Sequence, residues 1–165
     1  MAHAANAVEF LPLSDEENSS VLAGIYEFPG LALEAAPSAM IFRIGALSTT
    51  MPSLLKDLSE IAKRRHLDLA TLTRASGIVY AAFFAKEGNE TRPTEAASAA
   101  KEVFHTCTLP ENGAQAMLEW CPTEVKRAVG NLWGSARQDF ELMHRVKGVF
   151  DPQSVLSPGR FANGI

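Results

Sequence analysis

Few residues in this chain have the types and spacing that would let them do chemistry together. The four histidines are scattered, at His3, His66, His105 and His144, with no pair at the spacing of metal ligands. The two cysteines, Cys107 and Cys121, form no CxxC motif and lack an obvious basic neighbour in sequence that would stabilise a thiolate. GxGxxG, GxxxxGKS/T, GxSxG and HExxH motifs are all missing. The sequence therefore predicts neither a metal site nor a reactive thiol, and the catalytic residues stay unknown.

Two charged residues lie within apolar strand-like runs. Arg43 interrupts the run 39–47, and Glu119 lies within the run 115–121. In the sheet inferred below, the two strands are neighbours, so we expect Arg43 and Glu119 on the same open face, either as an ion pair or as two solvated charges.

The tail 150–161 has an informative order of residues. Asp151-Pro152 ends the preceding helix, because the residue before a proline is pushed out of the α region. Ser157-Pro158-Gly159 then forms a turn from which Arg160 projects. The spacing alone is also compatible with a plain helix stop followed by a turn.

The middle of the chain predicts an α+β fold of the ferredoxin-like βαββαβ type. Strands are expected at 39–47, 67–74, 78–85 and 115–121, with the second and third joined as a hairpin at Ala75-Ser76-Gly77. Helices are expected from Thr50 and Pro52 to Arg65, and from Thr91 and Pro93 to His105. In this fold two helices cover one face of an antiparallel sheet, and the other face meets solvent, a partner or a second domain.

Three parts are expected along the chain: a connecting arm at 1–38, the ferredoxin-like domain at 39–135, and a helix with its tail at 136–165. Within the arm, Ser14 is the expected N-cap of a helix over 15–24, and Phe28-Pro29-Gly30 is expected to break regular structure. A short helix is expected within 123–133. A capping box at 135–138 predicts that the last helix starts at 136, and its stripe of Phe, Met and Val is expected to be core.

Composition fits one globular domain. The chain has 165 residues, 47% of them hydrophobic and 21% charged. Its net charge of -4 gives no basic footprint for nucleic acid. The chain has no basic start followed by an apolar run, and no uninterrupted apolar stretch approaches the roughly 18 residues of a membrane span. We therefore expect a cytoplasmic protein without a membrane span.

The order of residues in the tail resembles a known family. A helix running into Phe150-Asp151-Pro152 and then Leu156-Ser157-Pro158-Gly159-Arg160 is similar to the carboxyl terminus of FAD-linked oxidases of the vanillyl-alcohol oxidase / p-cresol methylhydroxylase type. Serine stands at position 157 where that family usually has asparagine. Glu119-Trp120-Cys121-Pro122 and Trp133-Gly134 look most like the FAD-binding subunit of bacterial glycolate oxidase. The resemblance is good over 114–165.

The resemblance implies the cap, or substrate, domain of a flavoprotein, with Arg43 and Glu119 lining its substrate cavity. FAD would be held mainly by a domain absent from this chain, either part of a longer protein or a separate subunit. Ser157, Pro158, Gly159 and Arg160 would dock near the flavin domain, where an arginine could stabilise a reduced flavin anion or hold a substrate carboxylate. The cap would help to oxidise a small 2-hydroxy acid such as glycolate, and this chain alone would be inactive. Arg127 and Trp133 also match the family pattern but receive no chemical role.

An interpretation from another class stays open. A free-standing ferredoxin-like domain could bind a partner or small ligand through its open sheet face without catalysis, and fold analogy alone cannot separate the two. On either interpretation, an exposed apolar sheet face predicts homodimerisation.

Overall fold

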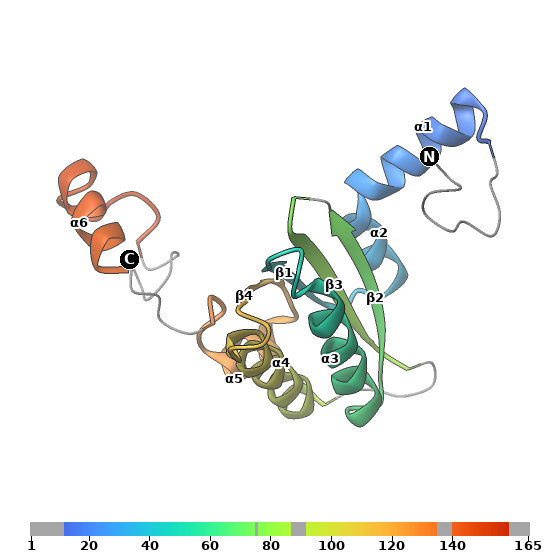
Figure 1. Ribbon diagram of the computed structural model, residues 1–165. Coiled ribbons are helices and arrows are strands. Elements are labelled where there is room, and N and C mark those ends of the chain that lie inside the picture. Colours follow the sequence, from blue (N-terminus) through green and yellow to red (C-terminus); the bar gives the residue numbers. More distant parts are fainter. Residues whose placement is uncertain (1–11, 75, 87–91, 135–139, 159–165) are drawn as a thin grey trace.

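The computed structural model describes residues 12–74, 76–86, 92–134 and 140–158 (Figure 1). Its helices and strands, in chain order, are α1 (Asp15–Tyr26), α2 (Phe28–Ala35), β1 (Met40–Gly45), α3 (Met51–Arg64), β2 (Leu67–Arg74), β3 (Ile78–Ala85), α4 (Pro93–Thr108), β4 (Gln115–Trp120), α5 (Thr123–Val129) and α6 (Phe140–Phe150). Within the described residues, no helix is long and apolar enough to span a bilayer.

The four strands form one antiparallel sheet in the order β2-β3-β1-β4. Together with the βαββαβ order of β1 to β4, this is the ferredoxin-like arrangement expected from the sequence, and the α+β fold class is confirmed. The observed bounds of β2 and β3 coincide with those predicted. Gly77 makes the hairpin turn with φ of 82°, and its carbonyl accepts a hydrogen bond of 2.9 Å from the Ala46 amide.

Helices α3 and α4 cover one face of the sheet and enclose the core (Figure 1). In α3, Pro52 occupies the first turn, and Leu54, Leu58 and Ile61 recur at helical spacing and are fully buried. Phe42 of β1 meets Phe83 and Phe104 edge-on, with ring centroids 5.8 Å and 5.5 Å apart. The covered face therefore makes a complete core from β1 to α4.

A buried polar group ties α3 to the turn between α4 and β4. Asn112 is fully buried, and its Nδ2 donates to Asp57 Oδ2 at 2.8 Å and to the Thr106 carbonyl at 3.1 Å. Its Oδ1 accepts from Ser53 Oγ at 3.1 Å. Because its donors and acceptor are paired, Asn112 can be buried without an unsatisfied polar atom.

The amino-terminal region is more regular than predicted. Ser14 caps α1, as expected, and also forms a capping box with Glu17, but the helix continues to Tyr26. The expectation that Phe28-Pro29-Gly30 breaks regular structure is wrong, because these residues begin α2. Proline is tolerated in the first turn of a helix, where its missing N–H would have no intrahelical partner.

Helix α2 covers part of the sheet face opposite α3 and α4. A second apolar cluster joins Ala32 of α2 to Ile41 and Ala82 of the sheet, with Phe28 packed at its side. The open face is therefore smaller than the sequence predicts. The part that α2 leaves open lies toward the end of β1 that carries Arg43 and Gly45.

Strand β4 does not alternate strictly along its length. Leu118 pairs with Phe42 and Trp120 pairs with Ile41, so the register shifts by one residue at Glu119. Strict alternation would place Trp120 on the same side as the buried Leu118, but Trp120 is 50% exposed. A bulge of this kind reverses the side to which the following residues point.

Helix α6 stands apart from the two layers (Figure 1). Phe140 at its start is buried, but Val146, Val149 and Phe150 are exposed, the last by 81%. The expectation that this stripe is core is therefore wrong for three of its residues. The predicted capping box at 135–138 lies outside the described residues.

Candidate functional site

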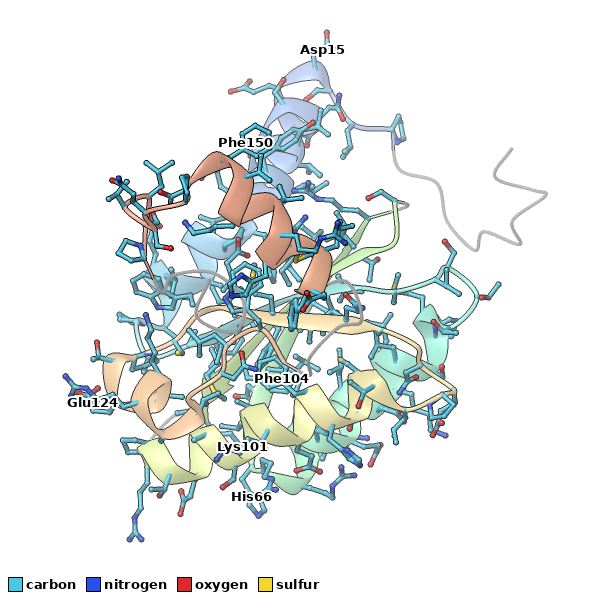
Figure 2. The ribbon with its side chains drawn as sticks, turned by 90° about the vertical axis from the view of Figure 1, so that its left-hand side faces the viewer. Asp15, His66, Lys101, Phe104, Glu124 and Phe150 are labelled. Carbon is cyan, nitrogen blue, oxygen red and sulfur yellow. The ribbon has the colours of Figure 1, made fainter. Side chains whose placement is uncertain are left out.

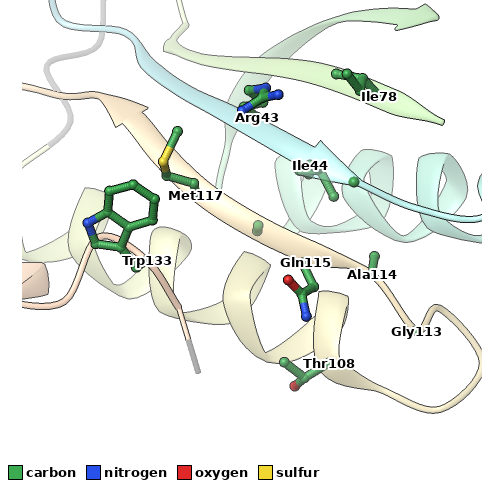
Figure 3. Close-up of a pocket in the computed structure, with 11 residues that line it drawn as sticks. Arg43, Ile44, Ile78, Thr108, Gly113, Ala114, Gln115, Met117 and Trp133 are labelled. Carbon is green, nitrogen blue, oxygen red and sulfur yellow. The ribbon is translucent and has the colours of Figure 1, made fainter. Parts of the chain in front are cut away.

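A hollow of about 490 Å³ opens at one end of the sheet, beside β1 and β4 (Figure 3). By register, the residues that reach it from the open sheet face are Arg43, Gly45, Ile78, Gln115 and Met117. Its remaining walls come from Ile44, Ala116, Thr108, Gly113, Ala114 and Trp133. The volume lies within the range of small-molecule sites, about 300–1,000 Å³.

Arg43 is the only charged residue among the described residues that line this hollow. It lies between Tyr80 of β3 and Met117 of β4 and is exposed, while its neighbours Phe42 and Ile44 are buried beneath the helices. No acidic side chain of the described residues forms an ion pair with it.

Glu119, the second predicted cavity residue, occupies the bulge of β4. It is exposed, it does not line the hollow, and no ion pair within the described residues joins it to Arg43. The structure thus separates the two candidates: Arg43 belongs to the hollow and Glu119 to its surroundings. Their role with a substrate stays a prediction.

The segment 131–134 lies along the outer edge of β4 and carries Trp133 into the hollow. The Leu118 amide donates to the Leu132 carbonyl at 2.8 Å, and the Trp133 amide donates to Asn131 Oδ1 at 2.9 Å. Gly134, with φ of 70°, packs so closely that a Cβ would lie 3.0 Å from Phe104. The Trp-Gly pair therefore has a structural reason: glycine permits the close approach that places the tryptophan.

Neither cysteine has the lowered pKa of a reactive thiol. Burial raises the pKa of Cys107 to about 12, and it also raises the pKa of the half-buried Cys121. Both thiols are therefore neutral near pH 7. Among the described residues, no cluster of His, Cys, Asp or Glu could hold a metal ion.

Asp151 organises the start of the tail. Its carboxylate accepts hydrogen bonds from the amides of Val155 at 2.9 Å and Leu156 at 3.0 Å, and from Lys147 Nζ at 2.6 Å. The Lys147 ammonium, together with the two amides, lowers the pKa of Asp151. Lys147 also donates to the Leu156 carbonyl at 2.8 Å, which closes the loop on the end of α6.

The predicted docking residues lie only partly within this described loop. Ser157 and Pro158 are exposed, and Ser157 has φ of 48°, a left-handed conformation that asparagine adopts more easily than serine. Gly159 and Arg160 lie outside the described residues. The described members of the set, Ser157 and Pro158, do not line the hollow that contains Arg43.

Residues 133–161 match the family model of the C-terminal domain of FAD-linked oxidases. The match supports a domain of that kind and extends from Trp133 through α6 and the Asp151 loop. It does not distinguish the vanillyl-alcohol oxidase type or a glycolate oxidase. Searches among curated proteins and among solved structures give no match.

Sequence reasoning missed several residues of the site. Thr108, Gly113 and Ile78 line the hollow but carry no motif, and Met117 carries no signal beyond its place in the predicted strand 115–121. Arg43 was found because a charge in an apolar run is a visible signal. Arg127, which also matched the family pattern, is exposed on α5 and does not line the hollow.

Proposed function

We propose that this chain is the cap part of an FAD-dependent oxidoreductase, with FAD bound mainly by a separate domain or subunit. The observation that carries the proposal is the match over 133–161 to the C-terminal domain of FAD-linked oxidases. The same segment holds the exposed apolar face of α6, which is a second support. The exposed large side chains in this segment are Leu142, Val146, Val149, Phe150, Val155 and Leu156. An apolar surface of this kind is typical of a protein interface.

In the proposed reaction, a 2-hydroxy acid such as glycolate is oxidised by FAD. FAD would accept the hydride; this chain would bind and orient the acid. Arg43 would hold the carboxylate, since it lines the hollow and forms no ion pair with an acidic side chain of the described residues. The tail, held by Asp151 at its start, would direct Pro158, Gly159 and Arg160 toward the flavin domain.

Recovery of the tagged chain from its own host cells tests the proposal. We expect an FAD-containing protein to be recovered with it, detected by flavin absorbance, and the recovered complex to reduce a dye with a 2-hydroxy acid. The double variant Val146→Lys, Val149→Lys should lose the flavoprotein, because two charges on the apolar face of α6 would have to be buried. Lys101→Met, an exposed change on α4, is the matched control and should retain it (Figure 2).

A calorimetric titration of the isolated chain with FAD is the complementary measurement. No binding heat is expected if FAD is held elsewhere. Stoichiometric FAD binding to the chain alone, or recovery of the wild-type chain without any flavoprotein, contradicts the proposal. The second result would favour a free-standing binding domain, and homodimerisation through the open sheet face is then checked by sedimentation.

A further inference from the structure

The hollow at the end of β1 and β4 is poorly matched to glycolate. Glycolate has no side chain, while a volume of about 490 Å³ exceeds what its carboxylate and hydroxyl can fill. Beyond Arg43, much of the wall is apolar or aromatic, with Ile78, Met117 and Trp133 contributing the large side chains. Such a wall stabilises apolar groups by removing their surface from water.

We propose that this hollow binds a monocarboxylate with a bulky apolar tail, its carboxylate on Arg43 and its tail between Met117, Ile78 and Trp133. Where the proposed function holds, on which this substrate assignment rests, the preferred substrate is an aryl or branched-alkyl 2-hydroxy acid and not glycolate. The single charge among the described lining residues argues for one carboxylate. A second carboxylate would have to enter an apolar wall without a cation.

The positions of Arg43, Met117 and Ile78 on the sheet explain how one ligand can contact both the cation and the apolar wall. Met117 is the direct partner of Arg43 across β1 and β4, and Ile78 is the partner of Gly45 one step further along the face. Directly opposed residues on one face have Cβ atoms about 4.5–5.5 Å apart. Figure 3 shows Arg43 and Met117 on the neighbouring strands, with Trp133 beside the strand that carries Met117. The cation and the apolar wall are therefore within the span of one small aromatic acid.

Calorimetric titration of the full chain, without flavin or partner, tests the site. The ligands are glycolate, lactate, 3-phenyllactate and the uncharged 3-phenylpropanol. The affinity should rise from glycolate to lactate to 3-phenyllactate, by about fourfold for each methylene-sized group that is buried. It should fall at least about tenfold when the carboxylate is replaced by the alcohol.

Three variants separate the charge from the wall. Arg43→Met should weaken lactate and 3-phenyllactate alike, by about tenfold or more, and Arg43→Lys should restore part of the loss because it keeps the charge but not the planar fork. Met117→Trp narrows the hollow with a residue suited to strands, and should weaken 3-phenyllactate more than lactate. Lys101→Met removes an equal charge elsewhere and should leave every affinity unchanged. Equal circular dichroism and melting temperatures check that each variant folds.

Equal affinity for glycolate and 3-phenyllactate, or unchanged binding by Arg43→Met, overturns the inference. Absence of binding by every acid also overturns it. Binding in the expected order without a recovered flavoprotein would leave the carboxylate site standing and remove the proposed function. A recovered flavoprotein with no selectivity for bulky acids would support the proposed function and contradict the assignment of a bulky substrate.

Discussion

Helices α3 and α6 carry similar apolar stripes but differ in burial. Leu54, Leu58 and Ile61 of α3 are fully buried against the sheet, while Val149 and Phe150 of α6 are 76% and 81% exposed. The spacing of apolar residues is helical in both. The difference shows that periodicity identifies an apolar face and leaves open whether the same chain covers it. The uncovered face lies within the stretch that matches the FAD-linked oxidase model.

The strongest test of this contrast is a matched pair of phenylalanine truncations. Phe42→Ala should lower the free energy of unfolding by about 3–5 kcal/mol, because it leaves a cavity between Phe83 and Phe104. Phe150→Ala should change it by less than about 0.5 kcal/mol in the isolated chain, since little contact is lost. Urea unfolding of both variants checks the pair. A comparable loss for Phe150→Ala would show that α6 is covered in solution.

A smaller loss of stability is expected from removing the buried Asn112 side chain, which links α3 to the turn between α4 and β4. Asn112→Ala should lower the free energy of unfolding by about 1–3 kcal/mol, because the Thr106 carbonyl and the Asp57 and Ser53 side chains lose a partner. Asn18→Ala, on the exposed surface of α1, is the control. Thermal unfolding of the two variants gives the comparison, and equal melting temperatures would contradict the bridging role.

A local effect is expected from Asp151. Its pKa is lowered in the folded loop, so the loop's hydrogen bonds are present above the ordinary aspartate pKa and are lost as the pH falls through the lowered value. NMR shifts of the Val155 and Leu156 amides should report this transition. Asp151→Asn should show the low-pH shifts already at neutral pH, whereas Asp68→Asn on β2 should not. Unchanged amide shifts in Asp151→Asn would show that the carboxylate does not hold the loop.

The smallest effect is expected at Ser157. Its left-handed φ of 48° disfavours serine, so Ser157→Asn should stabilise the loop by no more than about 1 kcal/mol. Slower hydrogen exchange of the Leu156 amide, with an unchanged global melting temperature, is the expected readout. Ser98→Asn, on the exposed side of α4, controls for a general effect of the side chain. Faster exchange in Ser157→Asn would mean that another conformation is preferred there.

Most of the fold could be predicted from local pattern. The β2 and β3 hairpin was recognisable because alternating and apolar runs flank a glycine turn, and both strands have the predicted bounds. Helix α2 was missed because Pro29 and Gly30 were interpreted as breakers, although a first-turn proline removes no intrahelical hydrogen bond. The bulge at Glu119 was missed because alternation contains no sign of one extra residue.

The site was less predictable than the fold. Arg43 could be identified because it is a charge within an apolar strand. Gly113 could not, since its position depends on a turn that a distant helix holds in place. The part played by Asp151 was missed for a similar reason: its hydrogen bonds to Val155 and Leu156 depend on the conformation of the intervening loop.

The Asn112 bridge also affects how a ligand would meet the hollow. The turn Leu109–Gly113 is closed by amides of Asn112 and Gly113 that donate to the Leu109 carbonyl at 3.0 Å and 2.8 Å, and the buried Asn112 side chain anchors it to α3. Gly113 and Ala114 of the wall are therefore ordered before any ligand arrives. Binding there would sacrifice little conformational entropy of the backbone, so more of the contact energy would appear as affinity.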